Sequence, residues 1–140
     1  MAAGDMITAT LNTLTAYNTL ANITTAATAN AGTADTDGLK QDYTFTPTKA
    51  ESKCLLLVTA IGPTATKADD NLAYSVAAGA NAFDNNAALT GSITKDTTDI
   101  IVLDGKYKSA TGTFVVTFTP TANDKIKTNH GLTVNFIELP

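Results

Sequence analysis

Short runs in which apolar and polar residues alternate recur along this chain, with the two-residue period of β-strands. Two runs show the alternation most clearly, 113–119 and 132–139. Each has one apolar face, made of Phe114, Val116 and Phe118 in the first run and Leu132, Val134 and Phe136 in the second. The alternation of the second run breaks near Ile137, which predicts a shift of register there. Residues typical of strands predict four more, at 43–47, 72–77, 89–94 and 98–103.

The run 53–61 is different because it is almost continuously apolar from Cys54 to Val58. Such a run predicts a strand that is buried on both faces. The three strongest runs together supply the predicted core, which consists of Leu55, Leu57, Phe114, Val116, Phe118, Val134 and Phe136.

Turn-forming residues separate the predicted strands at intervals of roughly 8–15 residues, as in sandwiches and barrels. Examples are Gly62-Pro63 and Asp104-Gly105. No segment has a convincing amphipathic helical pattern. The sequence therefore predicts an all-β fold, either an antiparallel β-sandwich or a jelly roll, with an extended N-terminal arm.

The first 38 residues differ from the rest of the chain and form a separate predicted segment, followed by the sandwich domain at 39–140. One strand is expected within 7–17. Residues 18–38 are nearly all Thr, Ala, Asn, Asp and Gly, which is too little apolar surface to fold alone. They are either a surface loop or an arm that becomes ordered on another surface. We expect part of 21–38 to contact another subunit.

Composition excludes several classes of function. The chain has 140 residues, 9 Lys, no Arg and a net charge of −4, which argues against binding nucleic acid. No apolar run approaches the about 18 residues that a membrane span needs. The N-terminus lacks the basic and apolar regions of a secretory signal. A single Cys and a single His exclude an internal disulfide and a Cys/His zinc site.

Nucleophilic catalysis has two candidate residues, His130 and Cys54. His130 lies in a predicted turn, and a general base there needs a nucleophile and an orienting group. Cys54 opens the most apolar run, where a thiol behaves as a small buried hydrophobe rather than a reactive thiolate. We therefore expect no catalytic residue.

Acidic clusters raise the question of a cation site. In 35–38 (Asp-Thr-Asp-Gly), aligning Gly38 with position 6 of a calcium loop puts Thr33 and Thr44 at the two end-ligand positions, where carboxylates are needed. The other clusters have the composition of Asx turns; they are Asp69-Asp70-Asn71, Asp84-Asn85-Asn86, and Asp96 with Asp99. No metal or cofactor is expected.

Carbohydrate chemistry also finds little support. A glycosidase needs two carboxylates in a cleft, and the only glutamates are Glu51 and Glu138. Without Trp, the aromatic side chains available for stacking on a sugar are tyrosines: Tyr17, Tyr43, Tyr74 and Tyr107.

Three short motifs occur in order along the chain. Residues 46–58 read TPTKAESKCLLLV, residues 74–79 read YSVAAG, and residues 136–140 read FIELP. In this order the chain resembles small capsid decoration (cement) proteins of tailed bacteriophages, in which a KLLL strand, a V-x-A-G turn and a terminal F-E-L-P-like strand recur. The resemblance covers 43–140, and Ile137 is an insertion into the terminal motif.

The resemblance implies a β-sandwich or jelly roll on the outer surface of a virion, made in the host cytoplasm. It implies binding to major capsid protein subunits and a homo-oligomer, either a dimer or a trimer, with no enzymatic activity. Lysines near strand ends either protect sheet edges or form a solvated surface; they are Lys40, Lys53, Lys95, Lys106, Lys108, Lys125 and Lys127. The main alternative is a carbohydrate- or receptor-binding module, lectin-like or a tail-fibre tip. A fibre, pilus or surface-layer subunit is a further one.

Overall fold

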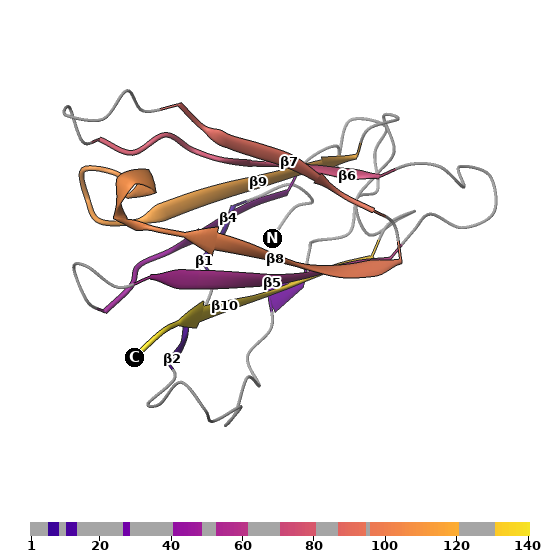
Figure 1. Ribbon diagram of the computed structural model, residues 1–140, viewed down its shortest axis with the longest axis horizontal. Helices are drawn as coiled ribbons and strands as arrows, with labels where there is room; N and C mark the ends of the chain where they lie inside the picture. Colours follow the sequence, from indigo (N-terminus) through magenta and orange to yellow (C-terminus); the bar gives the residue numbers. More distant parts are fainter. Residues whose placement is uncertain are drawn as a thin grey trace.

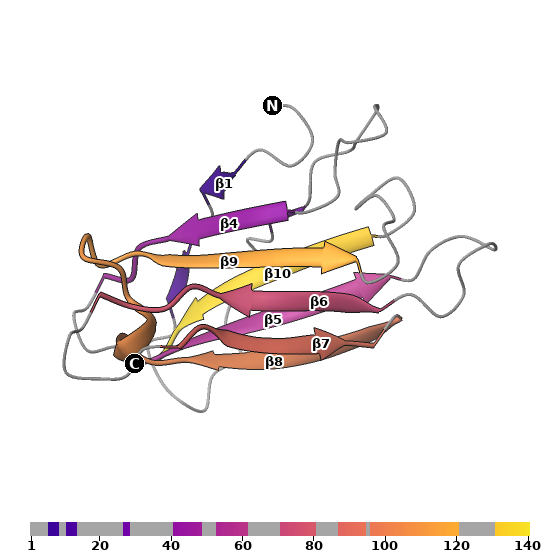
Figure 2. The ribbon, with the colours of Figure 1, turned by 90° about the horizontal axis from the view of Figure 1, so that it is seen from above.

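Two β-sheets lie face to face in the computed structural model of the chain (Figures 1 and 2). The structure describes residues 6–8, 11–13, 27–28, 41–48, 53–61, 71–80, 87–94, 96–120 and 131–140. Within these ranges there is no α-helix, and the one helical element is the 3₁₀ turn η1 (Gly105–Tyr107). The all-β prediction is thus confirmed, while the jelly-roll arrangement stays a prediction.

Sheet A has the strand order β1-β4-β9-β6-β7. Its strands are β1 (Ile7–Thr8), β4 (Gln41–Phe45), β9 (Phe114–Pro120), β6 (Leu72–Val76) and β7 (Leu89–Ile93). All neighbours pair antiparallel except β1, which runs parallel to β4.

Sheet B has the strand order β2-β10-β5-β8. Its strands are β2 (Leu11–Thr13), β10 (Gly131–Glu138), β5 (Cys54–Ile61) and β8 (Thr97–Leu103). The short strand β3 (Ala27–Thr28) also pairs with β10, beyond the stretch that β2 occupies. The central pairs β10–β5 and β5–β8 are antiparallel, and β2 runs parallel to β10.

The chain passes between the sheets at both margins. At one margin β7 ends sheet A, and the next strand, β8, ends sheet B (Figure 2). The turn between them holds Asp96 in the left-handed region at φ 59°, a conformation that Asp tolerates better than most residues. Strands that switch sheets in this way close the corners of a two-layer fold.

The core lies between the sheets and is rich in aromatic side chains. Phe45 from sheet A meets Phe136 from sheet B with ring centroids 4.0 Å apart, and it stacks on Phe114 at 5.2 Å. Tyr43 packs edge-on against Phe118 at 5.9 Å. Because β4 supplies Tyr43 and Phe45, it contributes more to the core than the sequence pattern predicted.

Five of the seven predicted core residues are confirmed as fully buried: Phe114, Val116, Phe118, Val134 and Phe136. The other two, Leu55 and Leu57, were predicted wrongly, because both are only partly buried. On β5 the buried side chains are those of the opposite parity, Cys54, Leu56, Val58 and Ala60. Strand β5 is therefore fully buried on one face, not on both.

The predicted register shift near Ile137 is also wrong. Strand β10 stays paired with β5 without interruption, from Gly131 opposite Ile61 to Glu138 opposite Cys54. Glu138 consequently remains on the core side and is fully buried, where its carboxylate accepts a hydrogen bond from Thr48 Oγ1 at 2.5 Å. This acceptor role explains how the alternation tolerates a charged residue type at a core position.

The N-terminal segment contributes two short strands within 7–17, where one was predicted. Strand β1 joins sheet A and β2 joins sheet B, separated by residues 9 and 10. The remaining predicted strands match β4, β6, β7 and β8 to within two residues at their ends.

Candidate functional site

The outer face of sheet B carries an uncharged, largely aliphatic surface. Alternation along the three long strands places nine side chains on this side of the sheet: Leu55, Leu57 and Thr59 from β5, Thr98, Ile100 and Val102 from β8, and Thr133, Asn135 and Ile137 from β10. Of these, Ile137 is buried, so the open part of the surface lies over β5 and β8. The four neighbouring residues Leu55, Leu57, Ile100 and Val102 form what we call the aliphatic face. Ile100 and Val102 are 58% and 56% exposed.

The register of β5 with β8 builds the aliphatic face as a rectangle. Leu57 lies opposite Ile100, and Leu55 lies opposite Val102. Both strands are locally continuous in apolar residues, so both of their faces are apolar there and only one can point into the core. The continuous run at 54–58 was a signal for this surface, and it was interpreted above as double burial.

The outer face of sheet A is chemically different. Its side chains are mostly small or hydroxylated: Asp42, Thr44, Ala73, Ser75, Thr90, Ser92, Val115, Thr117 and Thr119. Thr117 Oγ1 donates to Asp42 Oδ1 at 2.5 Å across the β4–β9 pair. The contrast shows that the aliphatic face is a property of one sheet, since the same fold carries a polar outer surface on the other.

Strand β8 is the last strand of sheet B, next to the aliphatic face. The N–H group of Ile100 donates to the carboxylate of Asp99 at 2.9 Å. This N–H therefore points away from β5 and is satisfied by the neighbouring side chain. A carboxylate at this position hinders the lateral addition of another strand to the edge.

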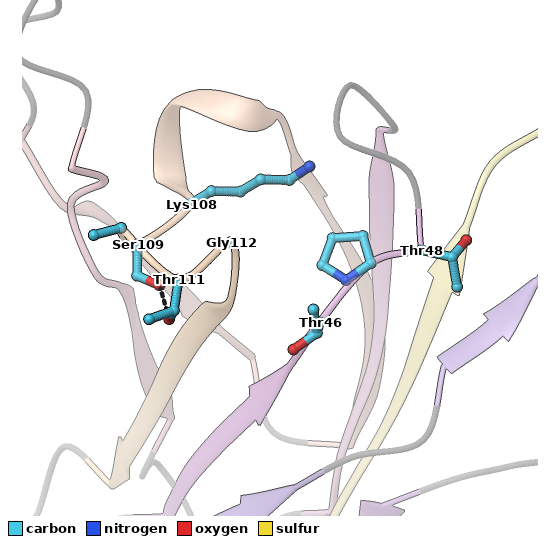
Figure 3. Close-up of a pocket in the computed structure, with 8 residues that line it drawn as sticks. Thr46, Thr48, Lys108, Ser109, Thr111 and Gly112 are labelled. Atoms are coloured by element: carbon cyan, nitrogen blue, oxygen red, sulfur yellow. Dashed lines mark hydrogen bonds between the residues drawn. The ribbon is translucent and has the colours of Figure 1, made fainter.

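A shallow cleft of about 400 Å³ opens at one end of the sandwich (Figure 3). Its walls are formed by residues 46–48 and 108–112, and the side chain of Lys108 extends across it. Ser109 Oγ lies 2.9 Å from Thr111 Oγ1 and 2.7 Å from Thr113 Oγ1, so the hydroxyl groups bond to one another. These bonds hold the 109–113 turn together, and they account for the hydroxyl cluster without a ligand.

The 3₁₀ turn beside this cleft is fixed by local contacts. Asp104 caps η1 by accepting a hydrogen bond from the N–H of Lys106 at 3.0 Å. The ammonium group of Lys106 lies 4.9 Å from the ring centre of Tyr107. Gly79 packs so closely on this turn that a Cβ there would lie 1.9 Å from the carbonyl oxygen of Lys106.

The candidate catalytic residues are not brought together within the described part of the chain. Cys54 is fully buried in the core, which confirms its prediction as a small hydrophobe. His130 lies outside the described residues. Asp96 and Asp99 are exposed at the β7–β8 corner, and the described ranges hold no group of three residues that could ligate a metal. The clusters at 35–38 and 84–86, together with Asp69 and Asp70, fall outside them.

The four tyrosines that were considered for stacking on a sugar have other surroundings where the structure describes them. Tyr43 is fully buried, and its hydroxyl has no hydrogen-bond partner among the described residues. Burial raises the pKa of this phenol well above its usual range. Tyr74 covers Gly91, where a Cβ would lie 2.4 Å from the Tyr74 hydroxyl oxygen. Tyr107 is half-buried under Lys106, and Tyr17 is outside the described residues.

Comparisons with known proteins found no matching protein-family model and no similar curated protein. No helix in the described ranges is both long and apolar enough to cross a membrane. Among the features of the described residues, the aliphatic face is the candidate site that the geometry supports best.

Proposed function

We propose that this chain is a structural virion protein that decorates the outer surface of a phage capsid and stabilises it by binding major capsid protein subunits. The sequence resemblance over 43–140 supports this proposal, and the two-sheet fold agrees with what the resemblance implies. The protein acts by protein–protein contacts and not by catalysis.

The observation that carries the proposal is the aliphatic face. Two branched aliphatic side chains, each more than half exposed and two residues apart on β8, lie beside Leu55 and Leu57 and mark a surface for protein contact. The nine positions of that outer sheet face hold no charged residue, and the centres of protein interfaces are likewise depleted of charge. A module with one such face and one polar face is suited to an assembly in which one side is covered.

The N-terminal segment supports a clamping role. Its strands β1 and β2 lie at the margin of sheet A and on the far side of β10 in sheet B. We propose that residues 1–38 act as an extended arm, of which part of 21–38 reaches a neighbouring subunit. An extended chain covers about 3.3 Å per residue, so such an arm spans subunit boundaries efficiently.

Capsids assembled without this chain provide the direct test. Purified full-length protein should bind them saturably, at a fixed ratio to capsid subunits, and should raise the temperature at which they disrupt. Deleting residues 1–38 should weaken this binding. Saturable binding to a glycan array with none to capsids would instead favour the carbohydrate-binding alternative and refute the proposal.

A further inference from the structure

One edge of sheet A carries backbone groups that the fold leaves unpaired. Strand β7 ends this sheet, and β6 is its hydrogen-bonded neighbour. On the other side of β6, the N–H of Ala77 donates to the carbonyl oxygen of Val115 at 2.9 Å, so Ala77 faces β9. Backbone groups along an antiparallel strand point alternately to its two sides. Leu72, Tyr74 and Val76 therefore face β7.

The same alternation identifies which groups of β7 point to its free side. Leu89, Gly91 and Ile93 lie opposite the residues of β6 that face β7, so they bond to β6. Thr90 and Ser92 consequently direct their N–H and C=O groups away from the sheet. These outward groups have no hydrogen-bond partner among the described residues. Donors and acceptors spaced in this way are completed by one further β-strand.

Strand β7 also lacks the features that block the addition of a strand. The sequence of 87–94 contains no charged residue and no proline. Strand β8, at the edge of sheet B, is protected by the Asp99 carboxylate, which accepts a hydrogen bond from the N–H of Ile100. Strand β1, at the other edge of sheet A, has only two residues. Among these described edges, β7 is the one that is both long enough and unprotected.

We propose that β7 pairs antiparallel with β7 of a second copy of this chain, about a two-fold axis that passes beside Gly91 perpendicular to sheet A. This register sets Thr90 opposite Ser92 of the second copy, and the two residues exchange both of their outward hydrogen bonds. Their hydroxyl side chains meet on the outer face, while Leu89 meets Ile93 on the core side. The contact is isologous, since each copy contributes the same strand.

The position of Tyr74 favours a second copy over an unrelated strand. Tyr74 lies opposite the buried Phe118, so it is on the core side of sheet A. Its hydroxyl oxygen lies over Gly91, 2.4 Å from the place of a Cβ, and has no partner among the described residues. In the proposed register the two Gly91 Cα atoms are about 4.5 Å apart. The two Tyr74 hydroxyls therefore meet at the axis, where they can bond directly or through a water.

The geometry of this margin predicts a weak dimer. Strands β7 and β8 end the two sheets at the same margin of the sandwich (Figure 2). Both copies carry Asp99, which is exposed on β8, so the two β8 edges repel and only sheet A is joined. A single pair of short strands is marginally stable in water. Dimerisation should therefore depend on protein concentration.

Sedimentation equilibrium of the full-length protein over a concentration series tests the proposal. Ser92→Pro removes an outward N–H that bonds to nothing within one copy, so it should weaken dimerisation at least about tenfold and leave the monomer folded. The matched control Ser92→Ala keeps this N–H and should leave the equilibrium unchanged. The thermal midpoint of each variant, measured at low concentration, shows whether it is folded.

Introduced charges test the register and do not depend on the proline variant. Thr90→Lys should weaken dimerisation, because a lysine on an edge strand opposes pairing. Adding Ser92→Asp to the same chain should restore it, since each introduced carboxylate then lies opposite an introduced ammonium group of the other copy. High salt should weaken the restored dimer.

Three results would overturn the inference. They are a protein that stays monomeric up to about 1 mM, a dimer that a folded Ser92→Pro variant does not weaken, and a dimer that Thr90→Lys leaves unchanged. Failure of the added Ser92→Asp to restore pairing would overturn the proposed register. The inference does not rest on capsid binding: a protein that dimerises through β7 without binding capsids would refute the proposed function and leave this inference intact.

Discussion

Replacing Tyr43 with phenylalanine should make this protein more stable. The Tyr43 side chain is fully buried between the sheets, where its ring packs against Phe118 and Phe136 at centroid distances of 5.9 and 6.0 Å. Its hydroxyl has no hydrogen-bond partner among the described residues. Phenylalanine keeps the ring and its contacts and removes only this group.

The expected gain follows from the balance of two effects. A buried polar group without a partner costs about 1–3 kcal/mol in lost hydration. Removing the oxygen leaves a small void, which offsets part of that gain. We expect Tyr43→Phe to raise the free energy of unfolding by about 1 kcal/mol. For a chain of this length the thermal midpoint then rises by roughly 3 °C.

The same substitution should alter stability at alkaline pH. Burial raises the pKa of the Tyr43 phenol in the folded state. Above about pH 10 the unfolded chain therefore loses this proton while the folded chain keeps it, and the free energy of unfolding falls as pH rises. Below about pH 10 the Tyr43 phenol is protonated in both states, so its ionisation does not lower the stability of the original chain. The Tyr43→Phe variant has no phenol at this position, so it does not lose this stability above about pH 10. The advantage of the variant should thus widen from pH 9 to pH 11.

Urea denaturation followed by circular dichroism at pH 7, 9 and 11 measures both effects. Tyr74→Phe is the matched control, since the Tyr74 ring is only half-buried over Gly91. It should change the free energy of unfolding by less than about 0.5 kcal/mol. A Tyr43→Phe variant that is less stable than the original chain at pH 7 would show that the hydroxyl is satisfied and would refute the reasoning.

Three further substitutions test the packing by the same denaturation assay. Phe118→Ala should cost about 3–5 kcal/mol because it empties a fully buried site, and a cost below about 1 kcal/mol would contradict that placement. Leu56→Ala should cost about 2–5 kcal/mol while its neighbour Leu57→Ala costs about 1 kcal/mol, and equal costs would contradict the assigned inner and outer faces of β5. Gly79→Ala should cost over about 1 kcal/mol because its Cβ overlaps a backbone carbonyl, whereas Gly105→Ala, with open space around it, should change little.

Strand positions were predictable because apolar and polar residues alternate clearly when one face of a strand is exposed to solvent and the other is buried in the core. Strands β9 and β10 have this pattern, and their predicted core residues are confirmed. Strand β5 lacks it, since Leu55, Leu56 and Leu57 are identical in type. A continuous apolar run does not say which parity points inward, and here the prediction chose the wrong one.

The candidate site shows the same limit to what the sequence predicts. The aliphatic composition of Leu55, Leu57, Ile100 and Val102 was evident in the sequence, but their meeting on one surface was not. It depends on β5 pairing with β8 in the register that sets Leu57 opposite Ile100. These residues are more than 40 positions apart, and local patterns contain no information on pairing over such a separation.

Sequence alone determined the class of fold, because period-two alternation and β-branched composition favour strands wherever they occur. It also determined that Cys54 is a core residue, because the thiol belongs to an apolar run. Tertiary structure decided which face of each continuous strand is covered. It also decided that Glu138 stays inside, since a hydroxyl from Thr48, distant in sequence, satisfies its carboxylate. Burial is a property of two packed layers, and it is established only when the second layer is in place.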